Sequence, residues 1–407
     1  MKTSEILKNL FAFVLVLLIF GKVQGQDWPG WRGEKRDGVV KGFVLPDVWP
    51  GQLTRVWQEK VGLGDASAAF VGGKLFLNVK QEENEVALCI DAATGKNIWK
   101  TILNPAPEVT GGARSHPGPR STPTVKNGKV YLIGTGGKIS CLDSNTGKEI
   151  WKNENFTEVP VFFAAMSPLV DDGKCIAHLN GKENGTIVAF NADNGEIIWM
   201  LKEPSTYSSP LLMKTGNEEI IVLQTETDVI GISKTGKLLW KVPTPGEQRF
   251  YNSSTPIIDG HNIIVCGQGK GTKSFKVEKS GDNYSITENW INPDFGVSFN
   301  TPVLKDGYLY GHEARLGKMY CLNAVSGKTC WADTTSHNRF ASTLDLGKVL
   351  LSLPAHGRML FYEPNTEKYV QKMMYKVAET DVYAHPLVVG NKIYIKDQEM
   401  LTCWQLK

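Results

Sequence analysis

The chain has 407 residues, of which 41% are hydrophobic and 21% charged, and its formal net charge is +3. This composition is typical of a globular protein and excludes an intrinsically disordered chain. The near-neutral charge excludes a general electrostatic attraction to nucleic acid or anionic membranes, and the length suits one large all-β domain.

The first 25 residues have the pattern of a secretory signal peptide. Lys2 and Lys8 precede an apolar run at 10–20, and residues 23–25 read VQG. Such a run is too short to span a bilayer comfortably and suits an export signal, although a retained membrane anchor is the alternative. We therefore expect cleavage after Gly25 and a periplasmic or secreted protein with no later transmembrane segment. No Cys lies near the cleavage point, so lipid attachment is not expected.

An eleven-letter pattern is repeated along the chain. Residues 89–99 read CIDAATGKNIW, and residues 141–151 read CLDSNTGKEIW. Less exact copies of the pattern follow along the chain. One further interval of similar length after the last of these copies reaches Met373, which stands where a Trp would be expected. Periods of 40–50 residues are typical of propellers and other repeat architectures. The Trp residues that mark the copies are Trp57, Trp99, Trp151, Trp199, Trp240, Trp290 and Trp331.

Each repeat contains the same series of short elements. A Ser/Thr-Pro opener such as STPTV at 121–125 begins it, and Gly-containing turns separate apolar β-branched runs. This pattern predicts four antiparallel strands per repeat, with no helix. We therefore expect an all-β, eight-bladed β-propeller, closed by pairing of the N-terminal strand with the C-terminal blade. The blades are predicted at 66–101, 121–153, 166–202, 207–243, 253–292, 300–333, 341–377, and 383–407 with 53–60.

The repeated motif D-x-x-T-G-K-x-x-W is interpreted as a hairpin. Its Asp and Thr can bond local backbone amides, and its Gly supplies a positive φ. The Trp is expected to lie between neighbouring sheets, because a four-stranded sheet has two apolar faces that need cover.

These motifs resemble those of the PQQ-like β-propeller family, which includes quinoprotein alcohol dehydrogenases and BamB-like assembly factors. The family motif A-x-D-x-x-T-G-x-x-x-W matches at 89–99 and 141–151, with Cys in place of Ala. The segment DWPGWRGEKRDG at 27–38 also resembles a leader of secreted bacterial members. The resemblance implies the fold and says little about activity. We expect residues 26–52 to form a cap, with Trp28 and Trp31 covering one face of a propeller at 53–407.

Seven Cys do not suggest a disulfide framework. Cys89, Cys141, Cys321 and Cys403 occupy the same position in different repeats, so they should lie too far apart to bridge. We expect them to be small buried hydrophobes. Cys321 shares a hairpin with Cys330, and this pair alone is left open as a possible bridge.

The residues that precede each opener should ring one axial mouth. This inner ring holds four Arg (Arg114, Arg120, Arg249 and Arg339) and two His against one carboxylate, Asp65. Converging Arg and aromatic rings suit an anion or an acidic sugar. The alternative is that these Arg pair with backbone carbonyls and close the channel. The candidate ligand-binding residues are Arg120, Tyr207, Arg249, Tyr251, Asn300, Arg339, Tyr383 and His385.

The favoured function is a non-catalytic binding or scaffold protein for a protein partner or an acidic oligosaccharide, acting as a monomer without cofactor or metal. The resemblance implies partner binding through face loops, as in BamB-like proteins. One alternative is a polysaccharide lyase that uses Tyr251, His385 and Arg339, with HEAR at 312–315 as a further acid/base pair. A PQQ-dependent dehydrogenase is less favoured, because the adjacent Cys-Cys pair of those enzymes is missing.

Overall fold

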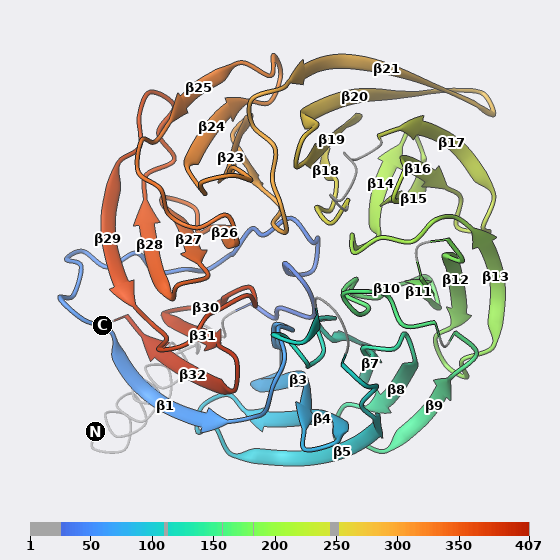
Figure 1. Ribbon diagram of the computed structural model, residues 1–407, viewed down its shortest axis with the longest axis vertical. Helices are drawn as coiled ribbons and strands as arrows, with labels where there is room; N and C mark the ends of the chain where they lie inside the picture. The colour runs from blue at the N-terminus through green and yellow to red at the C-terminus, as the bar shows by residue number, and fades with distance from the viewer. Residues whose placement is uncertain (1–25, 110–112, 157, 182, 245–251, 407) are drawn as a thin grey trace, which may run out of the picture.

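The computed structural model describes residues 26–109, 113–156, 158–181, 183–244 and 252–406. The predicted signal peptide at 1–25 lies outside these residues. The described chain forms eight four-stranded antiparallel sheets that are arranged as the blades of a ring (Figure 1). The prediction of an all-β, eight-bladed propeller is therefore confirmed. Within the described ranges, no helix has the length and apolar character needed to cross a membrane.

The strands follow the order that the repeats predicted. The first four blades are β2 (Ala69–Val71), β3 (Lys74–Gln81), β4 (Asn84–Asp91) and β5 (Asn97–Pro105); β6 (Thr124–Lys126), β7 (Lys129–Ile133), β8 (Ile139–Asp143) and β9 (Glu149–Asn153); β10 (Leu169–Asp171), β11 (Lys174–Leu179), β12 (Thr186–Asn191) and β13 (Ile197–Lys202); and β14 (Leu211–Thr215), β15 (Glu218–Gln224), β16 (Asp228–Ile232) and β17 (Leu238–Pro243).

The second half of the ring repeats this arrangement. Its blades are β18 (Ile257–Asp259), β19 (Asn262–Gly267), β20 (Gly271–Ser280) and β21 (Asn283–Asn292); β22 (Val303–Lys305), β23 (Tyr308–His312), β24 (Met319–Asn323) and β25 (Thr329–Ala332); β26 (Ala341–Asp345), β27 (Leu350–Pro354), β28 (Arg358–Tyr362) and β29 (Gln371–Lys376); and β30 (Leu387–Val389), β31 (Lys392–Lys396) and β32 (Met400–Gln405), completed by β1 (Thr54–Lys60).

The two ends of the propeller close the ring. β1 pairs antiparallel with β32, from Thr54 opposite Gln405 to Lys60 opposite Met400. The eighth blade is thus built from both ends of the chain, as predicted. Because the ring is closed, both faces of this blade are covered by the neighbouring blades.

Most of the repeated Trp residues bond to the next blade. The Trp99 indole Nε1 donates to the Ser144 carbonyl oxygen at 3.1 Å, and Trp151 Nε1 donates to that of Ala192 at 3.0 Å. Both acceptors lie in the hairpin turn of the following blade, whose Gly packs against the indole. A Cβ on Gly147 would lie 2.6 Å from Trp99, and Gly147 has a φ of 71°. The motif therefore encodes contact between blades as well as a turn.

The Asp of the motif organises this turn. Asp143 Oδ1 accepts hydrogen bonds from the Asn145 and Thr146 amides at 3.0 and 2.8 Å, and from Thr146 Oγ1 at 2.9 Å. These bonds hold the pKa of the Asp143 carboxyl below its usual value. The turn thus has the local side-chain bonding expected from its sequence.

All seven Cys are unpaired in the structure. Cys89, Cys141, Cys321 and Cys403 are fully buried, as expected for small hydrophobes that pack behind the Trp strand. Cys321 and Cys330 lie on the neighbouring strands β24 and β25 and do not bridge.

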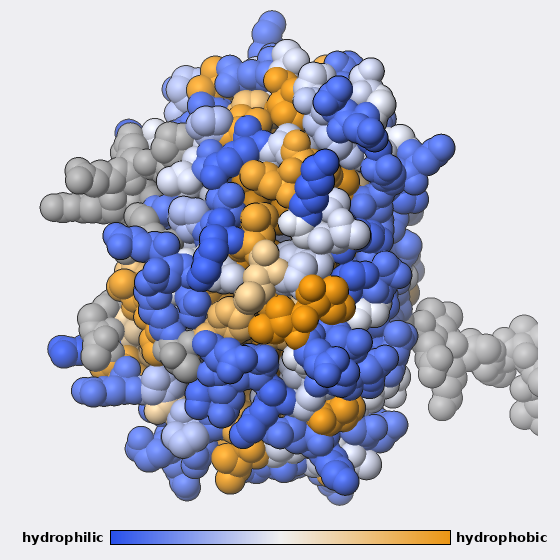
Figure 2. Space-filling model, turned by 90° about the vertical axis from the view of Figure 1, so that its right-hand side faces the viewer, coloured by the Kyte–Doolittle hydropathy of each residue, from blue (hydrophilic) through white to orange (hydrophobic). Residues whose placement is uncertain are grey.

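The outer strands expose some apolar side chains. Figure 2 views the side of the ring that carries β13 and β17 and shows a band of apolar residues among hydrophilic ones. On β13, Ile198 and Met200 are exposed. Exposed apolar residues are common on protein surfaces, and the core lies between the blades.

Candidate functional site

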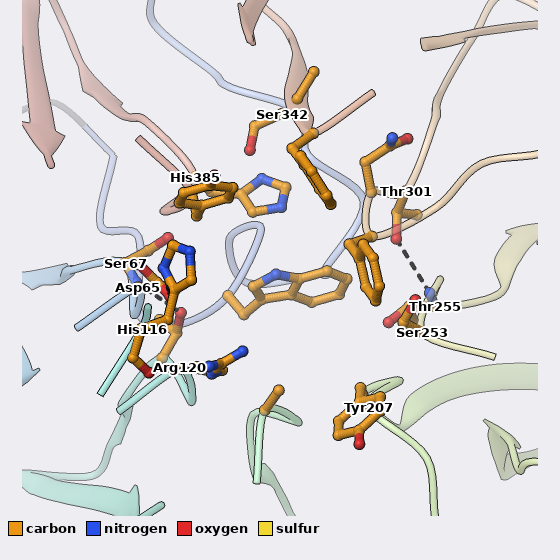
Figure 3. Close-up of a pocket in the computed structure, with 18 of the residues that line it drawn as sticks. Asp65, Ser67, His116, Arg120, Tyr207, Ser253, Thr255, Thr301, Ser342 and His385 are labelled. Carbon is orange, nitrogen blue, oxygen red and sulfur yellow. Dashed lines mark hydrogen bonds and ion pairs between the residues drawn. The ribbon is translucent and has the colours of Figure 1, made fainter. Parts of the chain in front are cut away.

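A pocket of about 390 Å³ lies at one axial mouth of the propeller. Every blade contributes to its wall through the segment that leads into its innermost strand, as the openers predicted. Figure 3 shows labelled side chains from these segments arranged around the pocket. The lining includes Asp65, Ser67, His116, Arg120, Thr122, Phe162, Tyr207, Ser209, Ser253, Thr255, Phe299, Asn300, Thr301, Phe340, Ala341, Ser342, Val382, Tyr383 and His385.

The Ser/Thr residues of the openers form a hydroxyl belt around the axis. In this belt, the backbone amide of one blade donates to the hydroxyl oxygen of the next, as from Thr122 to Ser167 Oγ at 3.1 Å. Because each oxygen accepts an amide hydrogen, its own hydrogen can be donated to a ligand. Five interfaces repeat this bond, through Ser67, Thr122, Ser167, Ser209, Thr255 and Thr301.

The N-terminal segment fills the channel below the belt. It bonds to the first blade between Trp28 and Phe70, and its blue trace enters the centre of the ring (Figure 1). Arg32 donates to the carbonyl oxygens of Thr301 and Pro302 at 2.8 and 3.0 Å. Arg36 reaches the opposite side of the ring, where it donates to the carbonyl oxygens of Ser167, Pro168 and Pro210.

Trp31 lines the pocket. The next residue, Arg32, is bonded to the sixth blade within the channel, so we place Trp31 at the inner end, or base, of the pocket. A second cavity of about 350 Å³ lies on the other side of this segment, lined by Gly30, Gly33, Glu34 and Arg36. The segment 28–36 therefore separates two cavities along the axis. The pocket at the mouth is closed at its inner end.

The charge of this region is positive. Arg32 and Arg36 are buried, and burial lowers the pKa of each guanidinium to about 10, which leaves both charged at neutral pH. Carbonyl oxygens accept most of their hydrogen bonds, and the Asp37 carboxylate acts on Arg32 from nearby. Asp65, the one carboxylate among the described lining residues, is 3.0 Å from His116 Nδ1. Asp37 acts on Arg32 and Asp65 acts on Arg120, so the positive charge is partly offset, and an anion in the pocket would meet the remaining excess.

Arg120 brings a cation to the wall itself. Its Nη2 donates to the His116 carbonyl oxygen at 3.0 Å, and its guanidinium lies over the Phe163 ring. Its Nε is buried and has no hydrogen-bond partner among the described residues. Burial lowers the pKa of Arg120, although nearby Asp65 acts in the opposite direction. Arg120 therefore places a guanidinium in the pocket wall, where a carboxylate would be attracted to its charge.

Aromatic rings form the lip of the pocket. Phe299 and Phe340 stack with their centroids 5.4 Å apart, and Phe340 meets Tyr383 edge-on at 5.5 Å. Across the mouth, Phe162 contacts Tyr207 at 6.2 Å. Phe299 is 52% exposed, so its ring face is open to a ligand.

The structure brings five of the eight predicted site residues together. Arg120, Tyr207, Asn300, Tyr383 and His385 all line the pocket. Asn300 holds the neighbouring loop, since its Nδ2 donates to the Arg339 carbonyl oxygen at 3.0 Å.

The other three predicted residues have different placements. Arg339 is exposed outside the lining, with its guanidinium 4.9 Å from the Phe340 ring centroid. Arg249 and Tyr251 lie outside the described residues. The predicted cluster of several Arg is thus represented in the described pocket wall by Arg120 alone.

The described residues considered for acid/base chemistry are buried or take part in hydrogen bonds that stabilise the fold. Burial, with a smaller effect of Arg32, lowers the pKa of His385 to about 3, so its ring is neutral at pH 7. His312 is buried, with Nδ1 3.2 Å from the Gly317 carbonyl oxygen and Nε2 2.6 Å from Ser352 Oγ. Glu313 accepts the Arg315 and Leu316 amides and organises a turn. The HEAR segment therefore supports the fold.

Comparison with known proteins identifies the family. Residues 82–333 match the family profile described as "Outer membrane protein assembly factor BamB". The chain belongs to this PQQ-like β-propeller family. Its resemblance to the family, predicted from the repeats, is confirmed.

The chain is similar both to a protein named as an assembly factor and to proteins named as dehydrogenases. Outer membrane protein assembly factor BamB of Moranella endobia is 31% identical over 45% of this chain and 43% of its own length. Quinoprotein alcohol dehydrogenase PedH of Pseudomonas putida is 25% identical over 51% of this chain and 34% of its own length. The aligned regions thus span less than half of these relatives.

Solved structures of PQQ-like propellers share the fold. BamB from Moraxella catarrhalis superposes with a TM-score of 0.65 at 14% identity, over 87% of this chain and 98% of that one. A europium-containing methanol dehydrogenase gives a TM-score of 0.69 at 13% identity, over 93% and 90% of the two chains. At these identities the likeness concerns the fold alone.

Several relatives are named quinoproteins, and PQQ held with calcium needs several oxygen ligands. Within the described ranges, no group of three or more His, Cys, Asp or Glu is placed to hold a metal. The Asp65 carboxylate already contacts His116 Nδ1. Among the described lining residues, Asp65 is the one carboxylate that could serve a calcium-bound quinone.

Two features of the site were missed in the sequence. The openers were interpreted as strand starts, although their hydroxyl groups form the belt. The expectation of a cap at 26–52 concerns Trp28 and Trp31 and does not include the entry of Arg32 and Arg36 into the channel. A repeated Ser/Thr at one repeat position and Arg residues within a Gly-rich segment were the available signals.

Proposed function

We propose that this protein is an exported, monomeric binding protein that takes an acidic saccharide in its axial pocket without catalysing a reaction. The observation that carries the proposal is the closed pocket whose described charged groups leave an excess of positive charge. Arg120 lies in its wall, Arg32 and Arg36 lie behind its base, and Asp65 is bonded to His116.

The lining suits a sugar ring better than a purely apolar ligand. The aromatic lip and Trp31 offer flat faces for the C–H surface of a pyranose, while the hydroxyl belt offers donors for its oxygen atoms. Arg120 would bind the carboxylate through a charge-assisted bond. A pocket of about 390 Å³ is at the small end of the ligand-site range. It accommodates a short saccharide.

The non-catalytic role is supported by the pKa of about 3 of buried His385, which makes its ring a weak base, and by the structural partners of His312 and Glu313. Export is supported by the N-terminal pattern. Names of related proteins include an outer membrane assembly factor and dehydrogenases, so the family alone does not select between binding and catalysis.

Titration calorimetry with trigalacturonate tests the proposal. We expect saturable binding, weakened about tenfold or more in Arg120→Gln, because a hydrogen bond to a charged group contributes about 1.5–3 kcal/mol. Neutral maltotriose should bind much more weakly than trigalacturonate.

Arg339→Gln is the matched control, because it removes an exposed Arg from the same face but not from the pocket lining. Equal weakening by both substitutions would indicate general charge attraction and contradict a pocket site. Absence of trigalacturonate binding to the wild-type protein, or release of unsaturated products that absorb in the ultraviolet, would overturn the proposal.

A further inference from the structure

We infer that the pocket recognises the end of an acidic glycan chain and not its interior. This inference rests on the proposed function and concerns how the same site would take its ligand. It follows from the closed base of the pocket, from the position of its cation and from the aromatic rings at its lip.

The base of the pocket is closed by bonded groups. Arg32 is tied to the sixth blade by bonds to Thr301 and Pro302, and Arg36 is tied to the third and fourth blades. Both side chains are buried, and their bonds cross the channel in opposite directions. A polymer therefore cannot thread along the axis. Whatever enters the mouth must also leave by it.

The small volume of the pocket favours one chain end over a bent internal segment. An internal residue would need two strands of polymer to pass through the mouth, one entering and one leaving. The aromatic lip of Phe162, Tyr207, Phe299, Phe340 and Tyr383 surrounds a pocket of only about 390 Å³. A terminal residue needs one passage. Its ring can lie against Trp31 with its carboxylate toward Arg120.

The lip provides a place for the residue next to the end. Phe299 is 52% exposed and stacks on Phe340, so its ring is held in place while its outer side stays open. A second sugar would lie against this ring on leaving the pocket. Residues further along the chain would extend into solvent and add little affinity.

Binding stoichiometry distinguishes the two modes. Calorimetry would compare galacturonic acid, digalacturonate, hexagalacturonate and a long polygalacturonate at equal concentrations of chains. We expect affinity to rise from the monosaccharide to the disaccharide and then to level off, with one protein bound per chain even for the long polymer. Several proteins on each long chain would overturn end recognition while leaving the proposed function intact.

A variant at the lip tests the second sugar position. Phe299→Ala should remove most of the affinity gained from monosaccharide to disaccharide and leave monosaccharide binding nearly unchanged. Val325→Ala, which truncates an exposed apolar residue in the β24–β25 turn, is the control. Equal loss for both sugars in Phe299→Ala would contradict a separate second position. No binding of any galacturonate would overturn the proposed function itself and this inference with it.

Discussion

At the scale of single residues, the contact between a Gly and the Trp of the preceding blade explains the repeated motif. Gly147 combines a positive φ with a position against the Trp99 indole. The Gly is therefore required twice, once by the positive φ of the hairpin and once by the indole of the neighbouring blade. This double requirement accounts for the similarity of the motif in successive repeats.

Gly147→Ala should lower stability markedly. The added Cβ would lie 2.6 Å from Trp99 and would force the indole to shift. Gly128→Ala is the matched control, because Gly128 has a nearly equal φ of 73° but has no atom within 4 Å of the Cβ position. Backbone strain costs about 1–3 kcal/mol at both positions, so chemical denaturation should show a larger loss for Gly147→Ala. Equal losses would contradict the inter-blade contact.

Buried His residues predict a loss of stability in mild acid. Burial lowers the folded-state pKa of His178 to about 4 and of His312 to about 3, below the unfolded value of about 6.5. The unfolded chain therefore binds protons first. Their contribution is present above pH 6.5 and is lost as the pH falls toward 4.

Thermal melts between pH 7.5 and 4.5 measure this effect. His312→Gln should reduce the fall in Tm over that range, although it also lowers Tm at pH 7.5. His261→Gln, at an exposed position, should leave the slope unchanged. A wild-type Tm that is flat down to pH 4.5 would contradict the buried neutral state of these rings.

Sequence patterns predicted the blades but only part of the site, and the reason is physical. Gly, Pro and Trp at fixed spacing determine the local backbone conformation, so their positions indicate directly where turns and strands lie. The pocket depends on which loops point inward around a closed ring. Arg120 and Arg339 both precede an opener, but only Arg120 lines the pocket. Such differences arise from loop packing, which the repeat pattern does not encode.

At the scale of elements, the N-terminal segment acts as an internal brace. It bonds to the first blade through Trp28, to the sixth and seventh through Arg32 and Val40, and to the third and fourth through Arg36. It therefore joins blades that do not touch one another. The same segment supplies Trp31 to the pocket, so stability and ligand binding are coupled here.

Arg36→Met should destabilise the protein by about 1–3 kcal/mol or more, because the carbonyl oxygens of Ser167, Pro168 and Pro210 would lose a buried donor. Lys35→Met is the control at the adjacent exposed position. Urea denaturation would compare the two variants. A loss no greater than that of the control would show that the segment does not brace the ring.

At the scale of the whole molecule, ring closure depends on one pair of strands from opposite ends of the chain. Gln58 lies directly opposite Thr402, and its Nε2 donates to Thr402 Oγ1 at 3.0 Å. This pairing spans 344 residues. It therefore closes a very long loop, whose entropic cost is recovered only when all the blades have formed.

A disulfide across this pair should stabilise the ring. In Gln58→Cys/Thr402→Cys, the oxidised form should melt well above the reduced form, because the cross-link restricts the unfolded chain by up to about 5 kcal/mol. The wild-type protein, whose Cys are unpaired, provides the control for oxidation itself. Failure of the bond to form under oxidising conditions would argue against the β1–β32 register.

The most direct measurement is a crystal structure of the protein with trigalacturonate. We expect one terminal residue inside the axial pocket, its carboxylate bonded to Arg120, its ring against Trp31 and its neighbour beside Phe299. A saccharide bound on the outer rim, or one that crosses the mouth with both ends in solvent, would contradict an end-recognising pocket.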